Sequence, residues 1–382
     1  ALGFQALSAV TTGSYNTGIG SYAGDAITTG SHNTAIGQAN GTATTTGGYN
    51  TTVGSQALNT NSTGANNTAV GYAALTENTT GANNTAVGKG ALDANTTASN
   101  NVAVGYTSLT ANTTGASNNA LGGGTLESNT TGSNNVAIGQ SALNANSTAS
   151  NNTAVGYACL AANTTGTRNT SMGYGANDAC TIGRYNTSMG YNALSTDVDG
   201  DYAVAIGYAA LENQESDSAN QELWNVAVGA LAGAAVSSGI QNTYIGGYTG
   251  GGAVNTADNN VGVGFKALQL NTTGDRNVAI GANALDTNTT GAANVAIGYL
   301  AMDANTTGNS NTALGAYALD ANTTAGDNTA VGNSALTANT TGGSNTAVGI
   351  GTLAANTTGA YNVAVGAAAL DAEVGGDFSV AV

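Results

Sequence analysis

The sequence predicts an all-β fold, a parallel β-solenoid or β-roll built from about 22 coils of equal length. Glycines that follow an aliphatic residue recur at a constant interval of seventeen positions, as at Gly71, Gly88 and Gly105. The Thr-Ala-Val or Thr-Ala-Ile segment before these glycines suits a short strand, because β-branched side chains pack well on a pleated surface. The Asn-Thr-Thr-Gly segment later in the unit is rich in residues that form turns.

Each unit has the same approximate pattern, Asn-Thr-Ala-Val-Gly-Tyr-x-Ala-Leu-x-Ala-Asn-Thr-Thr-Gly, followed by two variable residues. A unit of this length is too short for two helices, but it suits two short strands and two turns. The glycine after the aliphatic residue would permit a positive φ or a close approach of two backbones. The repeat therefore predicts three structural columns, in which equivalent residues of successive coils lie over one another: Val70, Val87 and Val104; Gly71, Gly88 and Gly105; Leu75, Leu92 and Leu109.

The regular spacing is interrupted only in the middle of the chain, by a longer step from Gly207 to Gly229 and by one extra residue between Gly246 and Gly264. We therefore expect a regular array over residues 1–211, an acidic insertion loop over 212–224, and a second array over 225–382 that continues beyond this segment.

Neighbouring strand residues such as Ala69 and Val70 point to opposite faces, and both are apolar in almost every unit. A strand that is apolar on both faces is usually buried on both. We expect Val70 to fill the coil interior together with Leu75, while Ala69 faces a cover outside the coil. Three copies of the chain packed side by side around an axis, a homotrimeric rod, are the simplest cover. The alternative is that the alanine is merely tolerated on a wet face.

Composition excludes several functions. The chain has 382 residues, of which only five are Lys or Arg and 21 are Asp or Glu, giving a net charge of −16. Five cations cannot form the basic surface that a nucleic-acid partner requires. No apolar run approaches the roughly 20 residues of a membrane span, so we expect no membrane insertion by this segment. One His and two Cys leave little for catalysis or a cofactor, and we expect no enzyme.

The motif Asn135-Val136-Ala137-Ile138-Gly139 resembles the head repeats of trimeric autotransporter adhesins, and residues 200–207 are closer still to that family. The resemblance implies a left-handed parallel β-roll with three chains side by side, displayed outside a bacterial cell. The unit in this chain is longer than the family's usual repeat. In this respect it is similar to repeats of phage tail fibres and marine surface proteins.

Asp197, Asp199 and Asp201 are the candidate metal ligands, because three carboxylates alternate around a glycine there. Hard cations such as Ca²⁺ prefer oxygen ligands of this kind. The alternative is a solvated turn without an ion, since no glutamate follows at the spacing of a complete EF-hand loop.

Trp224, Glu222 and Glu215 are the candidate binding residues of the insertion, where the only tryptophan lies among acidic residues. Tryptophan beside polar groups is a common binding anchor. The alternative is an inserted turn whose tryptophan covers the side of the stack.

Four further features have structural explanations. The column after the repeat glycine holds tyrosine in Tyr72 and Tyr106 but Lys89 in between, so we expect it to be exposed or at a chain boundary. His32 should be a surface residue. Cys159 stands in an alanine column and Cys180 in an asparagine column, so we expect a buried thiol at Cys159 and no disulfide between the two. Thirteen Asn-Thr-Thr or Asn-Ser-Thr sequons, from Asn61 to Asn356, would form hydrogen-bonded ladders or accept glycans.

These observations predict a structural and adhesive fibre segment without catalysis, located outside the cell or on a virion. Its partners would be copies of itself and a glycan or protein receptor on a host surface. The alternatives are a subunit of a self-assembling extracellular filament and an ice-binding solenoid. The ice-binding alternative is disfavoured because adjacent Thr79 and Thr80 should point to opposite faces.

Overall fold

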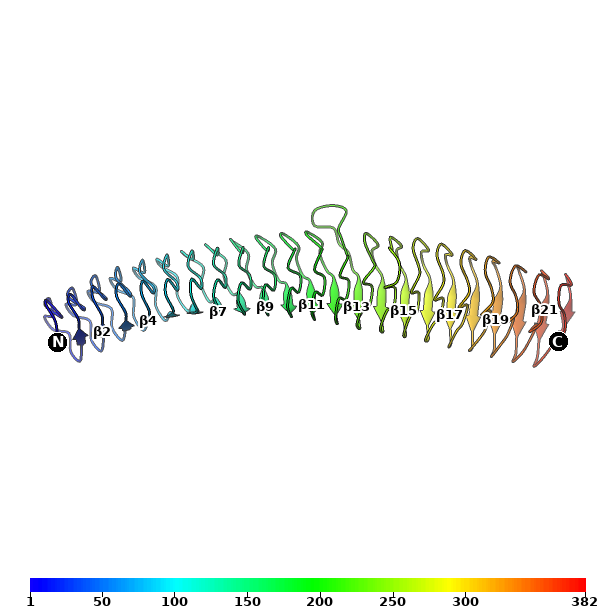
Figure 1. Ribbon diagram of the computed structural model, residues 1–382, viewed down its shortest axis with the longest axis horizontal. Coiled ribbons are helices and arrows are strands. Elements are labelled where there is room, and N and C mark those ends of the chain that lie inside the picture. Colours follow the sequence, from blue (N-terminus) through cyan, green and yellow to red (C-terminus); the bar gives the residue numbers. More distant parts are fainter. The chain divides into compact units, whose positions relative to one another are not determined.

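The computed structural model describes residues 1–382 as an all-β parallel solenoid that contains no helix. Each coil has one short strand, and Figure 1 shows that within each part of the chain the strands of successive coils lie side by side. The chain forms two compact units, residues 1–186 and residues 187–382. The long step between repeat glycines lies inside the second unit, between its strands Val204–Ile206 and Val226–Val228.

The first unit contains ten short strands: β1 (Thr17–Ile19), β2 (Thr34–Ile36), β3 (Thr51–Val53), β4 (Thr68–Val70), β5 (Thr85–Val87), β6 (Val102–Val104), β7 (Asn119–Leu121), β8 (Val136–Ile138), β9 (Thr153–Val155) and β10 (Thr170–Met172).

The second unit contains the remaining strands: β11 (Thr187–Met189), β12 (Val204–Ile206), β13 (Val226–Val228), β14 (Thr243–Ile245), β15 (Val261–Val263), β16 (Val278–Ile280), β17 (Val295–Ile297), β18 (Thr312–Leu314), β19 (Thr329–Val331), β20 (Thr346–Val348), β21 (Val363–Val365) and β22 (Val380–Ala381).

Within each unit, every strand pairs in parallel with the strand of the next coil. Val70 lies opposite Val87, and Val87 opposite Val104, with no shift of register. The register is retained across the long step, where Val204 lies opposite Val226. The prediction that each repeat forms one coil, stacked on the next, is therefore confirmed.

Each coil has one strand, and the expectation of two was wrong. After the repeat glycine, Ala73 and Leu75 adopt φ values of 53° and 57°, and Asn83 later in the coil has a φ of 60°. Extended strands need negative φ, so this part of the coil consists of turns. Its backbone still bonds to neighbouring coils: the N–H of Leu75 donates to the Ala91 carbonyl at 2.9 Å, and that of Asn83 to the Ala65 carbonyl at 3.0 Å.

The strand faces are the reverse of the expectation. Ala69, at the centre of β4, is completely buried inside the coil, whereas Thr68 and Val70 point outward and are partly exposed. The interior is closely packed around the central strand positions. At Gly18, which is equivalent to Ala69, an added Cβ would lie 2.8 Å from Cγ of Leu7 and 3.1 Å from the Ala23 carbonyl oxygen. Alanine thus lines the core, and the valines are the apolar side chains that remain exposed outside the coil.

The leucine and glycine columns lie where the repeat predicts. Leu75, Leu92 and Leu109 are completely buried. Gly71 has a φ of 134°, and a Cβ there would lie 2.6 Å from the Gly88 carbonyl oxygen. Any larger residue would collide with the backbone of the next coil, which explains the regular recurrence of glycine.

Two buried asparagine columns complete the interior. In the first, the N–H of Asn84 donates to Oδ1 of Asn67 at 2.9 Å, and Nδ2 of Asn84 donates to the Ala98 carbonyl at 2.9 Å. In the second, Nδ2 of Asn95 donates to Oδ1 of Asn78 at 2.8 Å. Side-chain amides therefore join successive coils wherever these columns continue, in addition to the strand pairing.

Tyr244 of the second unit replaces the central strand alanine and is completely buried. Its ring occupies space that two leucines would otherwise fill, because Gly233 and Gly250 stand in the leucine column beside it. A Cβ at Gly250 would lie 2.5 Å from Cε1 of Tyr244. Nδ2 of Asn255 donates to the tyrosine oxygen at 2.9 Å, so its polar end is satisfied.

Candidate functional site

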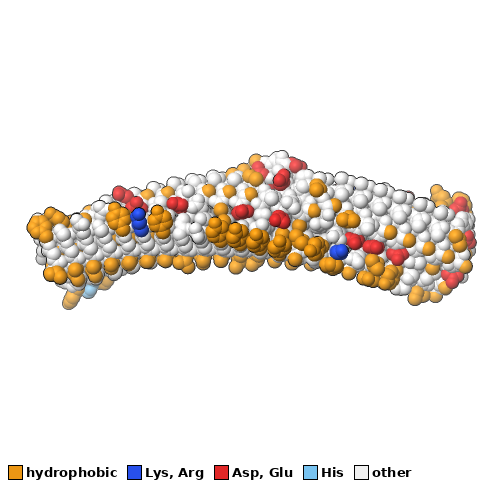
Figure 2. All heavy atoms as spheres, in the orientation of Figure 1, with side chains coloured by type: hydrophobic (Ala, Val, Ile, Leu, Met, Phe, Trp, Pro, Cys, Tyr) orange, Lys and Arg blue, Asp and Glu red, His pale blue; other side chains and the backbone are white.

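The candidate functional surface is the outer strand face, which we define as the first and third residues of strands β1–β21. The first position is Thr or Val in every strand except β7, which has Asn119. The third position is always Val, Ile, Leu or Met. None of these residues is charged, although acidic side chains occur elsewhere on the surface (Figure 2). Sequence reasoning missed this surface because it placed valine inside the coil.

The third-position side chains of the outer strand face form an apolar column that is partly or largely exposed in every coil. Ile19 is 41% exposed, Leu121 49% and Met172 39%. The remainder of each side chain is covered by its own coil and by the equivalent residues of neighbouring coils. Each unit thus presents an uncharged, β-branched surface along its whole set of strands, a composition typical of an interaction surface.

A tyrosine column flanks the outer strand face immediately after the repeat glycine. Tyr72 and Tyr106 are about half exposed, which confirms that this column lies at the surface. Tyr157 and Tyr174 stack with ring centroids 5.1 Å apart and an interplanar angle of 14°. The two rings therefore cover one face of each other. Nζ of Lys89 lies 5.8 Å from the ring centroid of Tyr106.

The three candidate calcium ligands have different environments. Asp197 is buried in the column that Asn78 represents, and it accepts a hydrogen bond from the N–H of Ser216 at 3.2 Å. Burial raises the pKa of Asp197 to about 6, while hydrogen bonds from Ser216 and Gly200 oppose that shift. Asp199 accepts a hydrogen bond from the Ser216 hydroxyl, and Asp201 is buried. The structure contains no group of three His, Cys, Asp or Glu side chains placed to hold a metal ion.

The insertion forms a smaller bulge than expected. Within residues 212–224, Gln214 and Leu223 are completely buried and belong to the coil. Residues 216–221 form the loop that protrudes between β12 and β13 in Figure 1. The N–H of Asp217 donates to Oε1 of Gln221 at 2.6 Å, which joins the two ends of this loop.

Trp224 belongs to a regular coil column, since it precedes Gly229 by the same interval that separates Tyr202 from Gly207. The rings of Tyr202 and Trp224 stack with centroids 4.3 Å apart. Nε1 of Trp224 donates to Oε2 of Glu222 at 3.2 Å, so these two candidate binding residues are in contact. Glu215 is exposed, and its N–H donates to the Ser237 carbonyl at 2.8 Å. The tryptophan therefore stacks on the side of the coils and retains partial exposure.

The histidine and cysteine predictions are confirmed. His32 is exposed and stacks between Tyr15 and Tyr49, with centroid distances of 4.8 Å on each side. Cys159 and Cys180 are both buried, and neither forms a disulfide bond. Burial raises the pKa of the Cys159 thiol to about 12, which keeps it protonated at neutral pH.

The sequon asparagines form one ladder in the coil interior of each unit. All thirteen are completely buried: Asn61, Asn78, Asn95, Asn112, Asn129, Asn146, Asn163, Asn271, Asn288, Asn305, Asn322, Asn339 and Asn356. A glycan on these amides would be incompatible with the folded coil. The sequence pattern is therefore explained by hydrogen bonding between coils.

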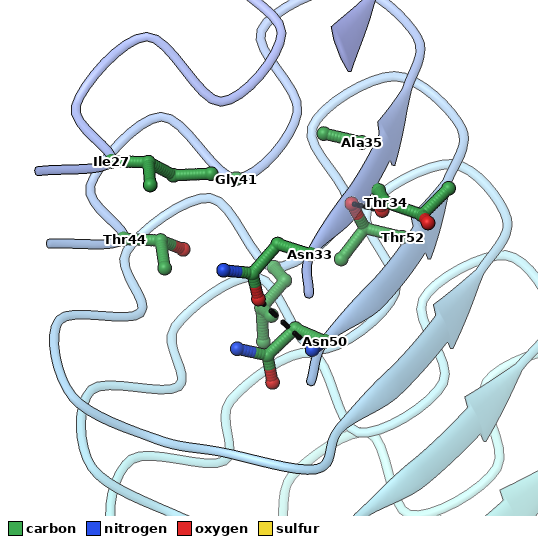
Figure 3. Close-up of a pocket in the computed structure, with 9 residues that line it drawn as sticks. Ile27, Asn33, Thr34, Ala35, Gly41, Thr44, Asn50 and Thr52 are labelled. Atoms are coloured by element: carbon green, nitrogen blue, oxygen red, sulfur yellow. Dashed lines mark hydrogen bonds between the residues drawn. The ribbon is translucent and has the colours of Figure 1, made fainter. Parts of the chain in front are cut away.

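A small interior cavity lies near the start of the first unit, where Gly41 stands in the leucine column and Thr44 in the asparagine column (Figure 3). Thr52 replaces the usual central alanine beside it and donates a hydrogen bond to the Thr34 carbonyl at 3.1 Å. The cavity has room for about one water molecule. It therefore reflects a local packing irregularity and is too small for a substrate.

No protein-family model matches the chain, and no curated protein matches it. The chain contains no helix that is long and apolar enough to cross a membrane.

Proposed function

We propose that this chain is a structural and adhesive segment of an extracellular fibre, without catalysis, and that copies of it associate side by side through the outer strand face. The observation that supports this proposal most directly is the absence of charge from the whole outer strand face. Depletion of charged residues is characteristic of the centre of protein interfaces.

The area of the outer strand face is consistent with a stable interface. A coil rises about 4.8 Å along the stack and a three-residue strand is about 10 Å long, so each coil presents about 50 Å². The ten coils of the first unit then present about 500 Å² and the eleven of the second about 550 Å². A standard interface buries about 800 Å² on each partner, and each unit by itself supplies more than half of that area.

The homotrimer is the assembly we favour, because the Asn-Val-Ala-Ile-Gly motif resembles the head repeats of trimeric adhesins. Three chains around an axis would cover the outer strand face, and the flanking tyrosines would lie at the rim of the interface. The cell surface or a virion is the proposed location on the same resemblance. Repeated weak contacts along such a fibre would add to the avidity for a host glycan or protein.

Trp224 and Glu222 are the residues we propose for receptor contact in this fibre. They touch each other, and the tryptophan is 47% exposed. The loop of residues 216–221 protrudes beside them, as expected for residues inserted into a solenoid. Trp224→Ala should weaken binding to a receptor-bearing surface without changing the mass of the assembly.

Mass in solution tests the assembly. The chain mass is 36.8 kDa, and light scattering after size exclusion should give three times that value. Val70→Glu combined with Val104→Glu should reduce the mass to that of one chain, because it places carboxylates inside the interface. The matched control is Thr63→Glu with Thr97→Glu, two exposed turn positions that are also separated by two coils. A wild-type chain that is monomeric at all concentrations would refute the proposal, whereas micrometre fibres would favour a filament subunit.

A further inference from the structure

We propose that Asn119 sets the axial register between associated copies of this chain. This inference rests on the proposed self-association through the outer strand face. Asn119 is the only residue at the first strand position that is neither Thr nor Val, and its side chain is exposed. The partner it recognises is the equivalent asparagine of another copy.

A repetitive interface needs such a residue because its apolar columns are degenerate. Each coil except that of Asn119 presents a Thr or Val at the first position, and every coil an aliphatic residue or Met at the third, so sliding one copy by a single coil exchanges uncharged side chains of similar size. The hydrophobic contact area changes little in such a slip, and burial alone selects no register. The same ambiguity exists in coiled coils, where one buried polar residue can specify the alignment of the chains.

The neighbours of Asn119 increase the difference in free energy between the aligned register and a register shifted by one coil. Val102 precedes it and Val136 follows it in the same column, in direct strand pairing. In the aligned register, the Asn119 amides of different copies face one another and can exchange hydrogen bonds. A slip of one coil in either direction places each amide against a valine, where its donor and acceptor are buried without partners. A threonine at either neighbouring position could form a hydrogen bond to the shifted amide through its hydroxyl, which valine cannot do.

The same coil has two further irregularities. Leu121, the third residue of β7, is the most exposed side chain of its column in the first unit, at 49%. Gly123 stands where the preceding coil carries Tyr106 and the following coil Gln140, and a Cβ there would touch only the Tyr106 carbonyl oxygen, at 3.8 Å. A protruding side chain beside an empty flank gives this coil a shape that the adjacent coils do not share. Shape and polarity therefore mark the same position along the stack.

Distances between spin labels on different copies test the proposal. The label is placed at Thr80→Cys, an exposed turn position, in a background with Cys159→Ala and Cys180→Asn. The parent assembly should give one narrow distance. Asn119→Val should keep the same mass but add longer distances, because copies slip by multiples of about 4.8 Å.

Two variants serve as controls for this measurement. Thr85→Val removes a hydroxyl from the same column and should leave the single distance unchanged. Moving the asparagine by one coil, with Asn119→Val and Val102→Asn together, should restore a single distance. An oligomer in which Asn119→Val retains the parent distance, or a parent that already shows several distances, overturns the register proposal alone. A parent of monomeric mass overturns the proposed function as well.

Discussion

Replacing one asparagine in the middle of the interior ladder should destabilise the first unit more than replacing the one at its end. Asn112 has three side-chain hydrogen bonds: Nδ2 donates to Oδ1 of Asn95 at 3.0 Å and to the Gly115 carbonyl at 2.9 Å, and Oδ1 accepts from Nδ2 of Asn129 at 2.8 Å. Asn112→Ala removes all three and leaves Oδ1 of Asn95 without its partner in a dry interior.

The magnitude follows from the number of bonds lost. An unsatisfied buried polar group costs about 1–3 kcal/mol, and a net hydrogen bond contributes about 1 kcal/mol. We therefore expect Asn112→Ala to lower the free energy of unfolding by about 3–5 kcal/mol. Asn163, at the end of this ladder, donates twice in the same way, but its Oδ1 has no partner because Cys180 stands in the next coil. Asn163→Ala should cost about 1 kcal/mol less than Asn112→Ala.

Urea denaturation followed by circular dichroism measures both variants. The slope of each transition must match that of the parent, since solenoids can unfold in parts and the comparison requires the same unfolding unit. Equal losses for Asn112→Ala and Asn163→Ala would refute the reasoning, because they would show that the bond that Oδ1 of Asn112 accepts from Asn129 in the next coil contributes nothing. A loss below about 1 kcal/mol for both would show that the ladder does not stabilise the coil.

The packing of the interior leads to four more predictions. Cys180→Asn should raise the stability of the chain by about 1 kcal/mol in the same urea assay, because it can donate to the unpaired Oδ1 of Asn163. Gly88→Ala should prevent the coils from closing and broaden or abolish the thermal transition, because its Cβ would lie 2.3 Å from the Gly105 carbonyl oxygen. Tyr244→Ala should lower the free energy of unfolding by about 3–5 kcal/mol through the cavity that it leaves. Asp197 has a pKa raised to about 6 in the folded chain, so the folded state binds its proton more tightly than the unfolded state does. Its contribution to stability is therefore greatest below about pH 4 and is lost as the pH rises from about 4 to 6. Asp197→Asn should make the free energy of unfolding, measured at a series of pH values, depend less on pH across that range.

Residue spacing alone predicted the solenoid and its columns correctly. A strict recurrence of Gly71, Gly88 and Gly105 at one interval requires equivalent backbone positions, and stacked coils are the simplest structure that provides them. Leu75 was correctly placed in the core, because a large aliphatic residue flanked by turn residues has no other apolar environment in a single coil. The Asn-Thr-Thr ladders also followed from spacing, since an amide repeated in register can bond to its own equivalent.

The candidate site was predicted less well because it depends on which strand face points inward. Alternation predicts that Ala69 and Val70 lie on opposite faces, but it does not say which face is inside. A count of apolar groups favours burying valine, and that choice was wrong. The register role that we propose for Asn119 could likewise not be predicted, because it depends on knowing that the first strand position faces outward.

The amino-acid sequence by itself determined the length of each coil, the parallel register and the identity of each column, because these depend on periodicity alone. Tertiary structure decided the direction of the strand side chains, the single strand per coil and the contacts of Trp224 with Tyr202 and Glu222. The physical reason is steric. Leucine and two asparagine columns already fill the narrow interior, so only an alanine fits between them in most coils, and valine is left to form the outer surface.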